Sequence, residues 1–177
     1  FSEGLEILLQ EIPEQILSDG AHFERSTMYH SLVYEDMLDL FNCLSLFDST
    51  PCDLSGLVEA LRQRIPGMAK WLNHMCHPDG EISFFNDAAQ GVAPTPGALA
   101  DYAKRLGFRD PPDPSGVSCH FADSGYARLS GESSVALLDV APLGPDYLPG
   151  HGHADTMSFE LSVHGQRVIV NGGTSTY

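Results

Sequence analysis

The sequence predicts an α+β chain in which helices come first and antiparallel strands follow. Up to about residue 110, apolar residues recur with the period of an amphipathic helix, and beyond residue 116 they alternate as in strands. Between these stretches, residues 110–116 read Asp-Pro-Pro-Asp-Pro-Ser-Gly, and so many prolines exclude both a helix and a central strand. We therefore predict a helical part over residues 1–110, a linker over 111–116 and a β part over 117–177.

The helical part divides into four predicted segments. The first covers residues 5–16, and the second begins at Ser26 or Thr27 and ends near Leu44. The third begins at Asp53 and reaches Met75, with a break or kink predicted at Pro66-Gly67. The fourth opens at Thr95-Pro96, since proline is favoured in a first helical turn, and ends near Gly107. Such helical hairpins pack into bundles, solenoids or α/α toroids.

The β part contains five runs with the alternation of strands, and His164-Gly165-Gln166 is predicted to form a hairpin turn. The predicted strands are Val117–Phe121, Tyr126–Leu129, Val135–Val140, Met157–Val163 and Val168–Val170. Five strands are too few for a closed sandwich, so we expect the chain to be a piece of a longer protein. In isolation it is expected to be marginally soluble and to bind a hydrophobic dye.

The charge of the chain is strongly negative. Its 24 acidic residues against 9 lysines and arginines give a net charge of −15. Nucleic acid and anionic lipid are therefore unlikely partners, because binding a phosphate backbone requires clustered cations. No apolar run approaches the ~20 residues of a membrane-spanning helix. An acidic polysaccharide remains a possible partner if histidines and arginines form a local basic cleft.

The first cluster that can carry chemistry runs from Asp19 to His30 and reads Asp-Gly-Ala-His-Phe-Glu-Arg-Ser-Thr-Met-Tyr-His. A helical turn would place His22 and Arg25 on one face, since they are three residues apart. Such a pair can neutralise a carboxylate and move a proton. The alternative is a solvated turn in which Arg25 pairs with Glu24 or Asp19.

The second cluster reads His77-Pro-Asp79-Gly80-Glu-Ile-Ser-Phe-Phe-Asn86-Asp87. One interpretation places His77 at a cleft together with Asn86 or Asp87. The other is a tight turn whose Asp and Asn side chains bond to their own backbone.

The third cluster, Gly150-His151-Gly-His153-Ala-Asp155, precedes a predicted strand. Alternate side chains of an extended segment point the same way, so these two histidines and Asp155 can converge on one site. Imidazole and carboxylate are natural zinc ligands, and a further ligand would have to come from elsewhere. The alternative is an exposed, histidine-rich turn.

In order and spacing, these three clusters and the closing Asn171-Gly-Gly-Thr-Ser-Thr-Tyr177 resemble the heparinase II/III family of polysaccharide lyases. The resemblance covers nearly the whole chain, and its third block is the most specific. It implies the end of an α/α toroid followed by the first strands of an antiparallel β-sandwich. It also implies β-elimination on a uronate-containing polysaccharide such as heparan sulfate or alginate, in the periplasm or outside the cell.

The resemblance also implies roles for individual residues. His22 is similar to the histidine that contacts the substrate carboxylate, with Arg25 nearby, and His151 to the base or acid that faces the cleft. His153 resembles a ligand of a structural zinc ion, and Asn171 stands where several members have a zinc-ligating aspartate. The residues expected to contact the substrate are Glu24, His30, Asn86 and Asp87.

One departure from the family pattern concerns the catalytic base. Members commonly have a tyrosine just before the Pro-Asp-Gly turn, whereas residues 71–77 here contain none. Either His77 or His74 replaces it, or Tyr29 reaches the site, or the reaction differs. If His77 is the base, replacing it with phenylalanine should abolish activity and barely change stability.

Two other functions fit the sequence. The first is a glycan-binding protein without catalysis, which the missing tyrosine favours. The second is a glycoside hydrolase, which would need two carboxylates across the cleft, supplied by Glu24, Asp79 or Asp87.

Overall fold

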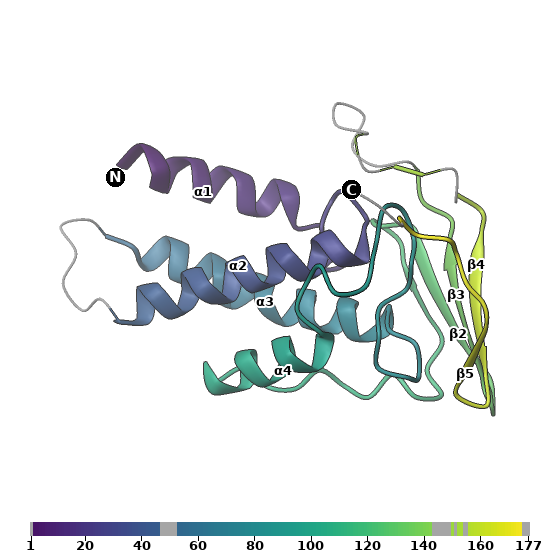
Figure 1. Ribbon diagram of the computed structural model, residues 1–177. Coiled ribbons are helices and arrows are strands. Elements are labelled where there is room, and N and C mark those ends of the chain that lie inside the picture. The colour runs from purple at the N-terminus through teal and green to yellow at the C-terminus, as the bar shows by residue number, and fades with distance from the viewer. Residues whose placement is uncertain (1, 47–52, 143–149, 151, 154–155, 175–177) are drawn as a thin grey trace.

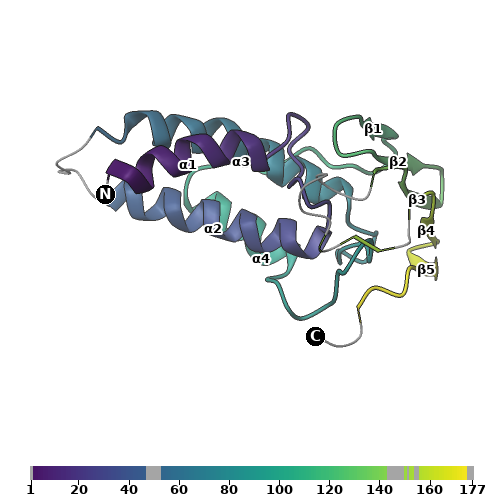
Figure 2. The ribbon, with the colours of Figure 1, turned by 90° about the horizontal axis from the view of Figure 1, so that it is seen from above.

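The computed structural model describes residues 2–46, 53–142, 150, 152–153 and 156–174. Its helices are α1 (Ser2–Gln15), α2 (Thr27–Leu46), α3 (Ser55–His74) and α4 (Pro96–Arg105). They lie side by side, and the sheet stands across one end of the group (Figures 1 and 2). The predicted α+β fold class is confirmed. Within the described ranges, no helix combines the length and apolarity needed to cross a bilayer.

The strands form one antiparallel sheet in sequence order. They are β1 (Cys119–Phe121), β2 (Tyr126–Ser130), β3 (Ser134–Asp139), β4 (Phe159–Val163) and β5 (Gln166–Ile169). Each predicted strand overlaps an observed one, and β4 and β5 are joined by a tight turn at His164-Gly165. Alternation of apolar residues was therefore a sufficient signal for the strands.

Pro66-Gly67 does not break the helix, one of the two predicted outcomes, because α3 continues through both residues. This part of α3 lies in close contact with the loop after α1, and the contact requires a glycine at position 20. The turn after α1 passes so close that a Cβ added to Gly20 would collide with the backbone of Gly67. Gly20 also has φ +96°, which side chains rarely adopt. This pair fixes the loop after α1 against the middle of α3.

A shared apolar cluster joins the helices to the sheet. Trp71 of α3 is fully buried and packs edge-on against Phe121 and Tyr126. Its indole N–H donates to Ser124 Oγ at 3.1 Å, and Ser124 in turn donates to Asp19. Buried aromatic rings contribute strongly to packing, so the sheet and helices are expected to unfold together.

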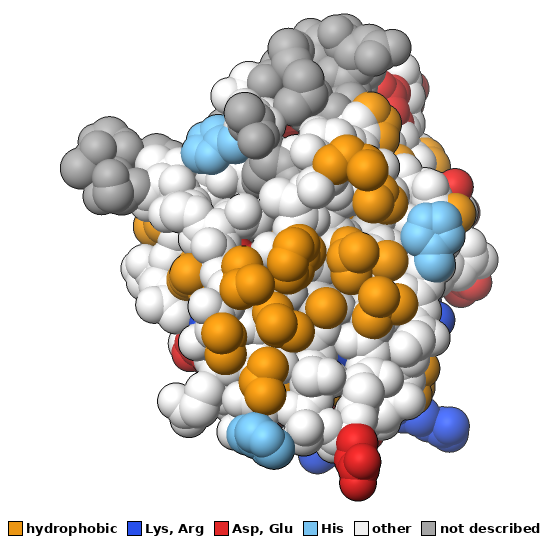
Figure 3. All heavy atoms as spheres, turned by 90° about the vertical axis from the view of Figure 1, so that its right-hand side faces the viewer, with side chains coloured by type: hydrophobic (Ala, Val, Ile, Leu, Met, Phe, Trp, Pro, Cys, Tyr) orange, Lys and Arg blue, Asp and Glu red, His pale blue; other side chains and the backbone are white. Residues whose placement is uncertain are grey.

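The two faces of the sheet differ in polarity. The face toward the helices carries buried polar residues, whereas the outer face is apolar and exposed (Figure 3). The buried polar residues are Arg128, Asp139, Glu160 and Ser162. The exposed apolar residues of the strands are Leu129, Phe159, Val168 and Ile169. The junction between helices and sheet thus combines the apolar cluster of Trp71 with buried polar groups, which can position a site for a polar substrate.

Candidate active site

The loop between α1 and α2 positions His22 through a second, buried histidine. The backbone N–H of His22 donates to His30 Nδ1 at 3.1 Å, so His30 carries its proton on Nε2 and donates to Met68 O at 3.1 Å. His22 itself is 3% exposed, with its ring 4.8 Å from that of Phe23. His30 therefore supports the loop from beneath, and His22 lies at its inner edge.

Arg25 follows in the same loop and turns toward the sheet. Its backbone has φ 61°, an uncommon value for a residue with a side chain, which the surrounding bonds maintain. Its Nη1 donates to Pro142 O at 2.7 Å, just beyond β3. Its carbonyl accepts from the Tyr126 hydroxyl at 2.9 Å and from Asn86 Nδ2 at 3.0 Å. The half-buried guanidinium is thereby held at the junction between loop and sheet.

Asn86 brings all three sequence clusters together. It also has a positive φ, 57°, and it bonds the Arg25 carbonyl of the first cluster. Its Oδ1 accepts from the backbone N–H of His153, in the third cluster, at 3.3 Å. Segments separated by more than 60 residues thus meet on one side chain. This convergence makes the junction the candidate active site.

His77 is also at the junction, but two side chains of β4 occupy both nitrogens of its ring. Its Nε2 lies 2.6 Å from Glu160 Oε2, and its Nδ1 lies 2.7 Å from Ser162 Oγ. The other oxygen of Glu160 accepts from the backbone N–H groups of Phe84 and Asn171. Both side chains of the His77–Glu160 pair are fully buried. This arrangement fastens the turn after α3 to β4.

A family model described as Heparinase II/III N-terminus matches residues 1–104, and one described as Heparinase II/III-like, C-terminal matches residues 113–177. The chain belongs to the heparinase II/III family. The resemblance seen in the sequence is confirmed. No curated protein matches the chain.

Solved structures of similar fold include a heparinase III, with a TM-score of 0.74 and 21% identity. A heparan sulfate lyase from Pedobacter heparinus gives a TM-score of 0.70 and 20% identity. Both alignments cover 98% of this chain, but only 31% and 29% of those proteins. At this identity the likeness shows the fold, and the chain spans about three tenths of the length of these structures.

The residues to which the family resemblance assigns roles lie in different environments. Tyr29 and Glu24 are half-buried, and Asp87 is buried. His153 is half-buried, with Nε2 3.5 Å from Thr174 Oγ1. His151 lies outside the described residues, so its role as base or acid stays a prediction.

A structural zinc ion, as the heparinase II/III family implies, does not fit the described residues alone. They contain no group of three His, Cys, Asp or Glu side chains that could hold a metal. The amide of Asn171 is turned toward Ser158 Oγ at 3.2 Å. Because His151 and Asp155 lie outside the described ranges, the zinc site with His153 and Asn171 also stays a prediction.

The sequence did not identify the sheet residues that bond the loops of the candidate site. Tyr126 and Glu160 are fully buried and bond the loops that carry Arg25 and His77. Asp139 is buried beside Tyr126, and its Oδ1 accepts from Ala141 N at 2.8 Å. The only available signal was the presence of charged residues within otherwise apolar strands.

Acid should destabilise the fold through His30. Burial, together with the nearby His22, lowers its pKa from 6.5 to about 3. The folded state favours the neutral ring, so the unfolded chain takes up the proton first as the pH falls. Stability present above pH 6.5 is lost toward pH 3, at up to ~1.4 kcal/mol per pH unit. Urea unfolding at pH 7, 6 and 5 measures this slope. A His30→Gln variant with an unchanged slope would contradict the assignment.

Removing the hydroxyl of Tyr126 should loosen the Arg25 loop. Tyr126→Phe deletes the donor to the Arg25 carbonyl and the acceptor for Asn86, and both bonds are buried or partly buried. We expect a loss of ~1–2 kcal/mol in the free energy of unfolding. The matched control is Tyr102→Phe, whose hydroxyl bonds Asp39 at the surface, and its loss should be smaller. Equal losses in urea unfolding would show that the Tyr126 hydroxyl has no special role.

Proposed function

We propose that this chain carries part of the active site of a polysaccharide lyase, which cleaves a uronate-containing acidic polysaccharide by β-elimination. The observation that carries the proposal is the meeting of the three sequence clusters at Asn86, in a chain of the heparinase II/III family. The names of the similar structures make heparan sulfate one substrate to test, and the sequence resemblance adds alginate.

The reaction needs charge neutralisation, a base and an acid. A base removes the proton from C5 of the uronate, next to the carboxylate. The electron pair left on C5 forms the C4=C5 double bond, and the C4–O4 bond breaks. An acid then protonates the departing O4, so no water is consumed. Neutralising the carboxylate favours the first step, because negative charge develops beside it.

Arg25 and His22 supply the neutralising group in this proposal. The half-buried Arg25 guanidinium donates to Pro142 O, and two bonds to the Arg25 carbonyl hold the backbone that carries it. A fixed cation near a low-dielectric surface binds a carboxylate more strongly than a mobile one in water. His22 lies three residues away in the same loop.

The base and acid are assigned to His151 together with Tyr29, since His22 is assigned to the carboxylate. His77 is less suited to proton transfer with a substrate, since Glu160 and Ser162 occupy both of its ring nitrogens. His74 is buried, and its Nδ1 bonds Lys70 O within α3. Tyr29 is half-buried and lies at the start of α2, close in sequence to His22 and Arg25.

The test is product analysis after incubation with heparan sulfate and with alginate. Elimination leaves an unsaturated uronate that absorbs in the ultraviolet and takes up no oxygen from labelled water. A glycoside hydrolase would give a saturated product carrying the label. Of the three carboxylates available to a hydrolase, Asp79 is already bound by Arg167 at 2.7 Å.

A glycan-binding protein without catalysis is the second candidate. The observation that favours it is that His77, near the position of the missing tyrosine, is buried against Glu160. This position of the chain therefore offers no side chain that can exchange a proton with a substrate. Binding of heparan sulfate without any rise in ultraviolet absorbance would support this candidate against the lyase. The periplasmic or extracellular location implied by the family stays a prediction.

A further inference from the structure

A cavity of about 600 Å³ lies on the α4 side of the molecule. It is bounded by the C-terminal end of α3, the N-terminal end of α4, residues 109–116 and the turn between β2 and β3. Of the described residues assigned above to the candidate active site, only His77 lines it. Its volume is within the range of roughly 300–1,000 Å³ that is usual for small-molecule sites. The cavity is therefore a separate candidate binding site.

A buried guanidinium forms one wall of this cavity. Arg128 of β2 is 3% exposed, and its Nη1 donates to the carbonyls of His74 and Cys76, at 2.9 and 2.8 Å. Its buried Nε has no hydrogen-bond partner, and it forms no ion pair with a carboxylate among the described residues. Burial lowers its pKa below the ordinary value. Asp113 acts on this charge electrostatically without forming an ion pair, and an anion in the cavity would offset it further.

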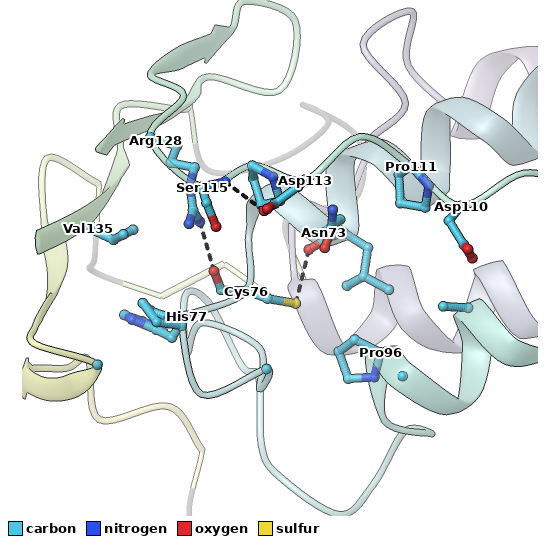
Figure 4. A pocket seen from close by; sticks show the side chains of 18 of the residues that line it. Asn73, Cys76, His77, Pro96, Asp110, Pro111, Asp113, Ser115, Arg128 and Val135 are labelled. Atoms are coloured by element: carbon cyan, nitrogen blue, oxygen red, sulfur yellow. Dashed lines mark hydrogen bonds between the residues drawn. The ribbon is translucent and has the colours of Figure 1, made fainter. Parts of the chain in front are cut away.

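The other polar groups around the cavity are of a different kind. Tyr34 is buried, and its hydroxyl has no partner among the described residues. Asp113 and Glu132 are exposed and line the cavity, as do Arg109 and Asp110, the second of which is paired with Lys104. Hydrogen bonds from Ser115 are the main cause that lowers the pKa of Asp113, so its carboxylate is ionised at neutral pH. Figure 4 shows Arg128 reaching from the sheet toward the turn at Asp113 and Ser115.

This combination selects one class of ligand. A simple anion would satisfy Arg128 but would be repelled by Asp113 and Glu132. A neutral sugar could donate its hydroxyls to those carboxylates, but it would leave the guanidinium unpaired. We propose that the cavity binds a sugar acid, with its carboxylate on Arg128 and its hydroxyl groups on Asp113 and Glu132. The site stands independently of the lyase proposal. If both hold, it is a second place where an acidic polysaccharide is bound.

The test uses free D-glucuronate, which has no glycosidic bond and so reports binding without elimination. Amide resonances of the complete, isotope-labelled protein are followed during titration with glucuronate, with glucose and with acetate. Glucuronate is expected to shift the amides of Ser115, Gly116 and Ser133, while glucose and acetate at equal concentration shift them far less. Equal shifts with acetate, or glucuronate shifts confined to the region of Arg25, would overturn the proposal.

Variants test which side chains of the cavity contact glucuronate. Arg128→Met should weaken glucuronate binding by about tenfold or more, the usual effect of losing a charge-assisted hydrogen bond. Because Arg128 also holds the end of α3, the double variant Asp113→Asn/Glu132→Gln tests the site at exposed positions, and it should weaken binding severalfold. Asp36→Asn, an exposed change on α2, is the matched control and should leave binding unchanged. Unchanged affinity in the double variant, or in a folded Arg128→Met variant, would refute the assignment.

Discussion

Replacing His22 or His151 with alanine is expected to lower kcat on a uronate polymer by ~10²–10⁴-fold, the usual effect of removing an acid–base or electrostatic group. His22→Ala removes a buried ring that packs against Phe23, so the free energy of unfolding is measured alongside kcat. The bond between this residue and His30 comes from the backbone N–H of His22, so the variant retains it. The measurement is the rate of rise in ultraviolet absorbance with heparan sulfate or alginate, made on the complete enzyme.

The control for this pair is His120→Ala, because His120 is an exposed histidine of β1. It should leave kcat unchanged and shows whether any loss is specific to the junction. Turnover like that of the unsubstituted enzyme in either His22→Ala or His151→Ala would remove that residue from the mechanism. A rise in KM with unchanged kcat would instead assign it to substrate binding alone.

The elements of the fold could be predicted because each has a local signal. Thr95 illustrates this, since a threonine followed by proline predicts a helix start, and its hydroxyl accepts from Ala98 N at the N-terminus of α4. Pro66-Gly67 shows the limit of such signals. The helix continues through both residues, and the backbone of Gly67 contacts Gly20, a contact that is not local in sequence.

The candidate site could be predicted only in part, for a similar reason. The clusters around His22, His77 and His153 were visible because histidines and carboxylates gather in short stretches. That they meet at Asn86 depends on bonds across more than 60 residues. Alternation in a strand also cannot tell which face meets the helices. Glu160 lies between two apolar residues and would ordinarily face solvent, yet the polar face of this sheet is the buried one.

Replacing His77 with phenylalanine is expected to destabilise the fold by ~3–5 kcal/mol, because it leaves the buried Glu160 carboxylate without its partner. The pair is 2.6 Å apart with both side chains fully buried, and Ser162 loses its bond to the ring as well. The free energy of unfolding in urea measures the loss. This expectation differs from that for a catalytic base, whose removal would abolish turnover and barely change stability.

Two further variants separate these outcomes. His77→Phe/Glu160→Leu removes both partners, so it should recover part of the stability that the single change loses, since no charge remains buried without a partner. Lys104→Met breaks an exposed ion pair with Asp110, in which the side chains are 65% and 56% exposed, and it should cost at most ~1 kcal/mol. A His77→Phe variant as stable as the Lys104→Met control but without turnover would identify His77 as the base. In that case the ring must leave Glu160 and Ser162 during the reaction, because in this structure neither of its nitrogens is available to a substrate.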